Sequence, residues 1–201
     1  MSLSPKSTSP LLETLLVRDG EVQHLSWHRK RMERSCQLLF NAPPPILDLQ
    51  PPQGFSGRCR VIYDTTIHSI DYFPLTPRTF QRFALIEAAP TYNHKYANRS
   101  ELDALKASYP DADEVIIVTS GVLTDTTISN IALFDGRHWL TPDTPLLEGT
   151  TRARLLDVGF LHPARLTPAN LYEASGFAMI NALLGFYPIT NPHFITTKER
   201  T

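Results

Sequence analysis

Seventeen prolines, against nine glycines, constrain the fold of this 201-residue chain more than any other feature of its sequence. Proline removes a backbone donor and ends helices, so we expect short elements joined by many loops. The prolines are densest at 43–52, directly after the proline-free stretch Trp27–Phe40. The sequence therefore predicts an amphipathic helix over Trp27–Phe40, with Ser26 as its N-cap, and no helix in the proline-rich segment.

Composition and charge exclude several classes of protein. Apolar residues make up 42% of the chain and charged residues 19%, which is enough for a buried core. The net charge of -1 argues against a nucleic-acid-binding surface. No apolar run reaches the length of a membrane span, and residues 1–10 lack the pattern of a signal peptide. Cys36 and Cys59 form no disulfide or CxxC pattern, so we expect buried free thiols and a cytoplasmic protein.

The first half of the chain reads as a small lobe built on one sheet. Leu11–Val17 and Glu21–Leu25 flank an Asp19-Gly20 turn, which indicates a β-hairpin. We expect three further strands to join this sheet and the helix Trp27–Phe40 to cover it. These strands are Gly57–Tyr63, Ser69–Phe73 and Arg82–Glu87. The predicted division of the chain is a flexible tail at 1–10, a small lobe at 11–89 and a larger lobe at 93–201.

The second half alternates short helices and strands without a strict βαβ order. Glu114–Val118 is a continuous β-branched run typical of a buried strand. Helices are expected at Ser100–Ser108 and Thr150–Val158, and the remaining strands at Ile128–Phe134, His138–Thr141, Phe177–Ile180 and Phe186–Ile189. The fold class predicted is α+β, or irregular α/β, in two lobes.

Common catalytic and metal motifs are absent from the sequence. His24 and His28 are spaced i, i+4 but lie without an HExxH or CxxC motif, so we expect no metal site. The chain also has no GxSxG, GxxxxGK[ST] or GxGxxG motif. These absences argue against the α/β-hydrolase, P-loop and Rossmann classes.

A lysine, a carboxylate and an anion-binding helix start remain as the candidate functional set. Lys95 lies in a polar stretch before a predicted helix, and Asp125 follows thirty residues later. Thr150 and Thr151 open a predicted helix after Gly149, where backbone N–H groups and hydroxyls together suit a phosphate. A pyridoxal phosphate enzyme needs these three groups: a Schiff-base lysine, a carboxylate on the ring nitrogen and a phosphate cup.

The order of these segments resembles the class IV aminotransferase family, and within it the 4-amino-4-deoxychorismate lyases. Leu12-Glu-Thr-Leu-Leu-Val-Arg-Asp-Gly and His28-Arg-Lys-Arg-Met32 are similar to the family's opening hairpin and H-x-x-R-[LM] helix. Lys95-Tyr-Ala-Asn-Arg99 resembles the family's K-x-x-N-R segment. Thr124-Asp-Thr-Thr-Ile-Ser-Asn130 is similar to its acidic loop. Leu147–Arg152 and Ile180-Asn-Ala-Leu183 resemble its two phosphate-side loops.

The resemblance implies a role for each matching position. Lys95 would form the Schiff base and carry the proton, and Asp125 would hold the ring nitrogen. The phosphate would be bound by Arg31, Thr150, Thr151 and Asn181. The fold implied is that of D-amino acid aminotransferase, two lobes with pyridoxal 5'-phosphate between them, in a homodimer that acts on a small amine or amino acid.

This sequence departs from the family pattern in two respects. Asp125 stands where the family normally has glutamate, which is one methylene longer. The chain also lacks the opening strand and D-R-G-like loop of longer relatives, so the fold is expected to be truncated at its N-terminus.

Three functions stay open from the sequence. The first is a lyase that releases pyruvate to give 4-aminobenzoate. The second is a transaminase for branched-chain or D-amino acids, and the third is a cofactor-binding protein without activity. Four aromatic side chains expected to be exposed support a dimer: Trp27, Phe40, Tyr72 and Phe73.

Overall fold

The computed structural model describes residues 9–195, and the chain divides into two compact units. Unit 1 comprises Met1–Thr76 and His94–Asn98, and unit 2 comprises Pro77–Asn93 and Arg99–Thr201. Most of the tail predicted at 1–10 lies outside the described residues. In the described range, no helix is both long and apolar enough to cross a membrane.

Unit 1 is built on an antiparallel sheet with the strand order β2-β1-β3-β4. The turn between β1 and β2 confirms the hairpin, because Asp19 and Gly20 both have positive φ, as a two-residue turn of this kind requires. The strands are β1 (Leu11–Arg18), β2 (Glu21–Val22), β3 (Gly57–Tyr63) and β4 (Ile67–Phe73).

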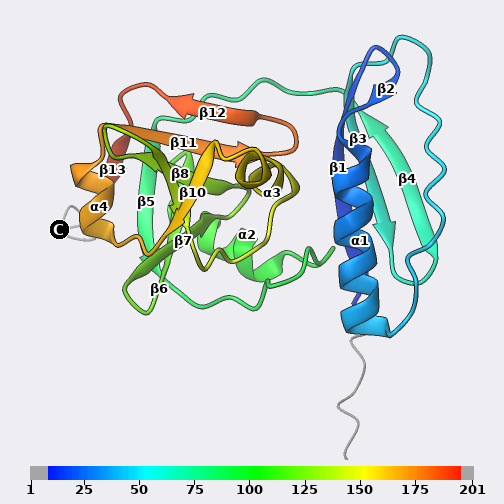
Figure 1. Ribbon diagram of the computed structural model, residues 1–201, viewed down its shortest axis with the longest axis horizontal. Coiled ribbons are helices and arrows are strands. Elements are labelled where there is room, and N and C mark those ends of the chain that lie inside the picture. Colours follow the sequence, from blue (N-terminus) through cyan, green and yellow to red (C-terminus); the bar gives the residue numbers. More distant parts are fainter. Residues whose placement is uncertain (1–8, 196–201) are drawn as a thin grey trace, which may run out of the picture. The chain divides into compact units, whose positions relative to one another are not determined.

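Helix α1 (Leu25–Phe40) runs alongside β1 and β3 (Figure 1). It begins one residue before Ser26, with His24 in the left-handed region as its N-cap, so the predicted Ser26 cap is wrong. The helix ends at Asn41, which is also left-handed, and the proline-rich segment 43–52 contains no helix.

The core of unit 1 follows the two-residue period of its strands. Alternate residues of β1 and β3 point to one side and pack with Met32 and Cys36 of α1. Cys36 and Cys59 are both free and buried, as predicted. The apolar members from the two strands are Leu11, Leu15, Val17, Cys59, Val61 and Tyr63.

Unit 2 contains the larger sheet of the described chain. Its strand order is β10-β9-β8-β7-β6-β5-β13, and β11 pairs with both β8 and β12. The strands are β5 (Arg82–Glu87), β6 (Glu114–Thr119), β7 (Val122–Thr126), β8 (Asn130–Phe134), β9 (Trp139–Pro142), β10 (Leu161–Ala164), β11 (Gly176–Asn181), β12 (Gly185–Ile189) and β13 (His193–Ile195). The helices are α2 (Ser100–Ala107), α3 (Thr150–Asp157) and α4 (Pro168–Glu173).

The prediction that Arg82–Glu87 joins the first sheet is wrong. This strand is β5 of unit 2, where it pairs in parallel with β6 and β13. The Asp113 carboxylate fixes its start by accepting the backbone N–H groups of Gln81 and Arg82, both at 2.8 Å. Unit 2 therefore begins at Pro77, earlier than the predicted boundary at 89, and the segment 94–98 returns to unit 1.

Packing on the sheet of unit 2 positions α3. Strand β11 alternates between two clusters: Phe177 and Met179 lie in the main core, whereas Ala178 and Ile180 face the other side. Leu155 of α3 packs against this second side. Helix α3 is thus held against this second side of the sheet.

The aromatic side chains expected to favour a dimer are less exposed than predicted. Trp27, Phe40, Tyr72 and Phe73 are each half-buried within the single chain. Tyr72 packs edge-on against Phe55, with ring centroids 5.8 Å apart. These residues therefore lend less support to a dimer than the sequence indicated, and the dimer stays a prediction.

Candidate functional site

Asp125 lies at the centre of a hydrogen-bond network in unit 2, which we call the Asp125 network. It is on strand β7, directly opposite Asn130, the first residue of β8. The Asn130 side-chain amide donates to Asp125 Oδ1 at 2.8 Å and to the carbonyl oxygen of Leu147 at 2.7 Å. The Leu147 N–H donates to Asp125 Oδ2 at 2.8 Å. Asp125 and Asn130 thus hold both polar groups of the Leu147 backbone.

The position of Asp125 corrects one detail of the sequence interpretation. The acidic loop predicted around it is only the short turn between β7 and β8, and Asp125 belongs to the strand. Its side chain is almost fully buried. Burial raises the pKa of Asp125 to about 7, against the opposing effects of the Asn130 amide, the Leu147 N–H and the Arg152 charge.

The Asp125 network leads directly to the start of α3. The N-cap of this helix is Gly149, and no side chain caps it. A Cβ atom on Gly149 would lie 2.0 Å from Asn130 Oδ1, so only glycine allows this approach. Thr150 and Thr151 follow, and within residues 9–195 neither hydroxyl has a hydrogen-bond partner. The helix start therefore presents backbone N–H groups and two hydroxyls, which is a favourable site for an anion.

Asn181 ends β11 and shapes the turn that follows. Its Oδ1 accepts the N–H groups of Leu183 and Leu184 at 2.9 and 2.8 Å. Its amide donates to the carbonyl oxygen of Ile128, in the turn after Asp125, at 3.3 Å. Asn181 is thus hydrogen-bonded to the β7–β8 turn. Thr150 is connected to the same region indirectly, because Gly149, the residue before it, lies against the Asn130 side chain.

Two residues that the sequence did not assign to the site support the same turn. The buried Glu114 carboxylate accepts the Thr127 hydroxyl at 2.6 Å. The guanidinium of Arg99 donates to the carbonyl oxygen of Thr127 at 2.8 Å. Arg99 is the N-cap residue of α2, so this turn is held from the start of α2 within unit 2.

Lys95 lies in the segment that returns to unit 1. The Leu12 N–H donates to the carbonyl oxygen of Lys95 at 2.8 Å, and the Ala97 N–H donates to that of Pro10 at 2.8 Å. Tyr96 forms an isolated antiparallel bridge with Leu11. The backbone at Lys95 is therefore fixed against the start of β1, and its side chain is half-buried.

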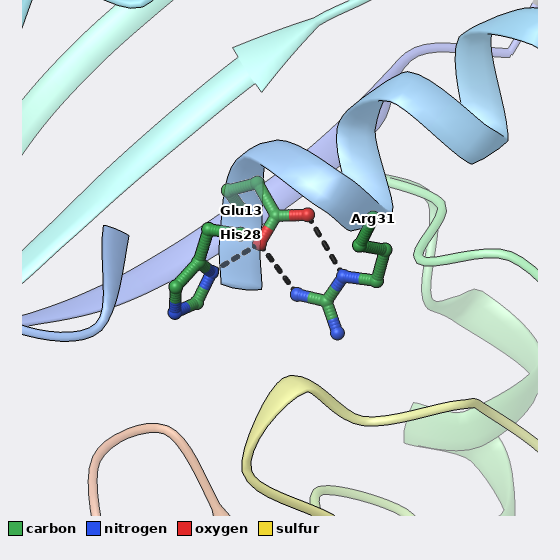
Figure 2. A network of polar contacts seen from close by, with 3 residues as sticks. All are labelled: Glu13, His28 and Arg31. Atoms are coloured by element: carbon green, nitrogen blue, oxygen red, sulfur yellow. Dashed lines mark hydrogen bonds and ion pairs between the residues drawn. The ribbon is translucent and has the colours of Figure 1, made fainter. Parts of the chain in front are cut away.

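Arg31 belongs to a second buried network, the Glu13 cluster, formed by Glu13, His28 and Arg31 (Figure 2). Arg31 donates from Nε to Glu13 Oε1 at 2.9 Å and from Nη2 to Oε2 at 2.5 Å. His28 Nδ1 lies 2.6 Å from the same Oε2. In Figure 2 the third guanidinium nitrogen of Arg31 points away from the carboxylate.

The carboxyl group of Glu13 favours its ionised form within the Glu13 cluster. Burial alone would raise the pKa of Glu13, but the Arg31 charge and the His28 hydrogen bond outweigh burial and hold the pKa at about 2. The sequence contained a signal for this cluster. Glu13 is the one acidic residue on the core-facing side of β1, between Leu11 and Leu15, and His28 and Arg31 are one helical turn apart.

The described residues hold no group of three or more His, Cys, Asp or Glu side chains that could bind a metal.

The structure brings Asp125, Thr150, Thr151 and Asn181 together within unit 2 and places Arg31 and Lys95 in unit 1. The roles of these six residues stay predictions.

Comparison with known proteins shows the family of this chain. The sequence pattern of the class IV amino-transferases matches residues 65–191, which is most of the chain. The chain belongs to the class IV aminotransferase family. A Haemophilus influenzae protein of uncharacterised function is 32% identical over 185 residues, covering 88% of this chain and 98% of the relative.

Solved structures show the same fold. A Haemophilus somnus protein, provisionally identified as a 4-amino-4-deoxychorismate lyase, matches with a TM-score of 0.75 and 28% identity, covering 89% of this chain and 98% of that one. A hypothetical aminotransferase of Mycobacterium tuberculosis, in its pyridoxal-phosphate-bound form, matches with a TM-score of 0.73 and 19% identity, covering 92% and 81%. The predicted class IV aminotransferase fold is therefore confirmed.

Proposed function

We propose that this protein is a pyridoxal-phosphate-dependent enzyme of the lyase type, which releases pyruvate from 4-amino-4-deoxychorismate and leaves 4-aminobenzoate. The observation that carries the proposal is the Asp125 network, which joins a buried carboxylate to an uncapped helix start. These are the two groups that unit 2 would contribute to such a cofactor, and they are connected, because Leu147, which donates to Asp125, shortly precedes the N-cap Gly149.

The residues present fit the cofactor. Thr150 and Thr151 would bind its phosphate through their N–H groups and hydroxyls. Each Asp125 oxygen accepts one hydrogen bond from Asn130 or Leu147, which leaves acceptor capacity for the N–H of a pyridinium ring. Such a cation would favour the ionised form of Asp125, against the burial that raises its pKa to about 7.

Lys95 would carry the covalent and proton-transfer chemistry. Pyridoxal phosphate supplies a carbonyl carbon that bonds to an amine and a ring that accepts electrons from a broken bond. Lys95 would hold that carbon until the substrate amine replaces it, and would then take the proton from the amine-bearing carbon of the substrate. The backbone bonds that fix residues 95 and 97 on β1 would keep the lysine in place.

The lyase reaction is favoured because the Haemophilus somnus relative, at 28% identity over nearly its whole length, is provisionally identified as such a lyase. The test is product analysis with 4-amino-4-deoxychorismate. We expect equal amounts of pyruvate and 4-aminobenzoate, and no need for a keto acid. Turnover that requires 2-oxoglutarate and releases no pyruvate would contradict the lyase assignment.

The second candidate is a transaminase, which the name of the matching family favours. The same residues would serve it, but the proton would return to the cofactor rather than leave with a departing group. Branched-chain and D-amino acids with 2-oxoglutarate test this alternative. Formation of glutamate at a rate above that of pyruvate release would establish the transaminase.

We also propose a homodimer, as the resemblance to the family implies. Light scattering at micromolar concentration should give twice the chain mass of 22.6 kDa. A monomeric mass with full activity would contradict it.

A further inference from the structure

Arg152, in the first turn of α3, is a buried charge that the proposed function leaves unused. Its side chain is only 7% exposed. Arg152 Nη2 donates to the carbonyl oxygen of Pro142 at 2.7 Å, and Nε donates to the Thr141 hydroxyl oxygen at 3.3 Å. The Thr141 hydroxyl in turn donates to the carbonyl oxygen of Ile131 at 2.8 Å. Arg152 therefore joins the start of α3 to the end of β9 and, through Thr141, to β8.

These hydrogen bonds do not account for the charge of Arg152. Both acceptors are neutral, and within residues 9–195 no carboxylate lies within ion-pair distance of the guanidinium. Burial disfavours the charged form and lowers the pKa of Arg152, yet arginine keeps its proton in proteins. Its position adds a second cost, because the positive end of the helix dipole repels a cation in the first turn.

Negative charge at the start of α3 would offset both costs. Thr150 and Thr151 directly precede Arg152, and each is more than nine-tenths buried. In the described part of the chain their hydroxyls have no hydrogen-bond partner, and no side chain caps the N–H groups of this turn. A cation, two hydroxyls and uncapped N–H groups within one helical turn form a site with a surplus of positive charge.

The nearby carboxylates do not remove this surplus. Those whose charge opposes the lowered pKa of Arg152 are Asp125 on β7, Glu148 before α3 and Asp143 after β9. Glu148 and Asp143 are exposed, so solvent screens their charge. Asp125 is buried, and burial raises its pKa to about 7, which favours its neutral form below that pH.

We propose that Arg152 is a specificity-determining residue of the anion site at the start of α3, where its fixed charge selects the doubly ionised form of a phosphate monoester. This inference rests on the proposed function, in which that monoester is the phosphate of pyridoxal phosphate. The guanidinium is held on β9 and would act through space, without touching the ligand. Its attraction for an anion grows with the charge of that anion, so a dianion gains more than a monoanion.

The first experiment compares the affinities of the protein for pyridoxal phosphate and for pyridoxal, which lacks the phosphate. The dissociation constant of pyridoxal divided by that of pyridoxal phosphate measures what the phosphate contributes. Arg152→Gln retains a hydrogen-bond donor but removes the charge, and should lower this ratio roughly tenfold to hundredfold. Arg152→Lys retains the charge and should keep the ratio within about threefold of the wild-type value.

Arg137→Gln is the matched control, because it makes the same change of charge at an exposed arginine in the turn between β8 and β9. It should leave the ratio unchanged. Arg152→Met removes the charge without burying another polar group, and replaces Arg152→Gln if that variant fails to fold. We expect it to lower the ratio to a similar extent.

The second experiment follows the ionisation of the bound phosphate by phosphorus NMR. A phosphate monoester in water takes up its second proton at about pH 6. In the wild type the resonance of bound pyridoxal phosphate should keep its dianionic position below that pH. In Arg152→Gln it should titrate at a higher pH than in the wild type, whereas a purely structural role of Arg152 would leave this titration unmoved.

The results distinguish this inference from the proposed function. An unchanged ratio in Arg152→Gln, or equal losses for the two ligands, would overturn the role of Arg152. A loss in Arg152→Lys as large as that in Arg152→Gln would also overturn it, because the hydrogen bonds to β9 would then matter rather than the charge. If the wild type does not bind pyridoxal phosphate, the proposed function is wrong. Inorganic phosphate then tests the site by itself: weaker binding in Arg152→Gln but not in Arg152→Lys would support the inference, and no binding by the wild type would end it.

Discussion

Glu13 in unit 1 and Asp125 in unit 2 are both buried carboxylates, yet their pKa values shift in opposite directions from the ordinary values. Glu13 is 0% exposed and Asp125 3%, so burial by itself penalises the charge of both. Glu13 has the guanidinium of Arg31 as a direct partner, and its pKa falls to about 2. Asp125 has an amide and a backbone N–H, and its pKa rises to about 7. The comparison shows that the charge of the partner, not the depth of burial, decides which form is stable.

The difference also suggests different uses. A carboxylate such as Glu13, which is paired with an arginine of the protein, already has its counterion and can hold that side chain in place. A carboxylate whose hydrogen-bond donors are all neutral, as they are for Asp125, still favours a positive charge in direct contact, which a pyridinium nitrogen would supply. The predictions below test this contrast, in order of decreasing effect.

The largest effect is expected from removing the charge of Glu13. Glu13→Gln leaves the Arg31 charge buried without its counterion, so the free energy of unfolding of unit 1 should fall by about 3–5 kcal/mol. Asp125→Asn should cost unit 2 only about 1–3 kcal/mol, the price of one poorly satisfied buried hydrogen bond. Urea unfolding can follow each unit separately, through Trp27 in a Trp139→Phe background and through Trp139 in a Trp27→Phe background. Equal losses at pH 7 would contradict the comparison.

The pH dependence of stability should differ in sign between the units. The pKa of Glu13, about 2 in the folded state, lies below its ordinary value of 4.5. Its contribution is therefore complete above pH 4.5 and is lost as the pH falls toward 2. The pKa of Asp125, about 7, lies above its ordinary value of 3.8, so unit 2 is favoured below pH 3.8 and loses stability as the pH rises to 7.

Asp125→Asn isolates this effect from other titrating groups. Between pH 7 and pH 4 the wild type should gain stability in unit 2 relative to this variant, at up to about 1.4 kcal/mol for each pH unit. Unit 1 should show no such difference. Parallel curves for wild type and variant over this range would show that Asp125 keeps an ordinary pKa.

A smaller effect is expected at the glycine beside the Asp125 network. Gly149→Ala places a Cβ against Asn130 Oδ1 and should cost about 1–3 kcal/mol, as overpacking does, with weaker binding of pyridoxal phosphate. The backbone is not the cause, because Gly149 has an ordinary φ of -69°. The cost should shrink when Asn130 is also alanine. An undiminished cost in that double variant would mean that Asn130 is not the obstacle.

Local elements could be predicted from the sequence because their signals are local. The two-residue period of Gly57–Tyr63 and the Asp19-Gly20 turn each determine the conformation of their own segment. The assignment of Arg82–Glu87 to a sheet could not be predicted in this way. Its partners are β6, about thirty residues later, and β13, at the far end of the chain, and no local pattern specifies such pairing.

The candidate site shows the same limit. Thr150 and Thr151 were identifiable because a glycine and two hydroxyls before a helix form a local pattern. The ties between Asn130 and Leu147, and between Glu13 and Arg31, span 17 and 18 residues. They depend on which strand faces which helix, so only the fold reveals them.

Reductive trapping tests the central claim, that Lys95 holds the cofactor, most directly. The protein is mixed with pyridoxal phosphate, reduced with borohydride, digested, and mapped by mass spectrometry. The chain has five lysines, of which Lys30, Lys95 and Lys106 lie in the described residues. We predict a single label on Lys95, the loss of that label in Lys95→Ala, and a turnover reduced by several orders of magnitude in that variant. A label on any other lysine, or full turnover by Lys95→Ala, would contradict the account.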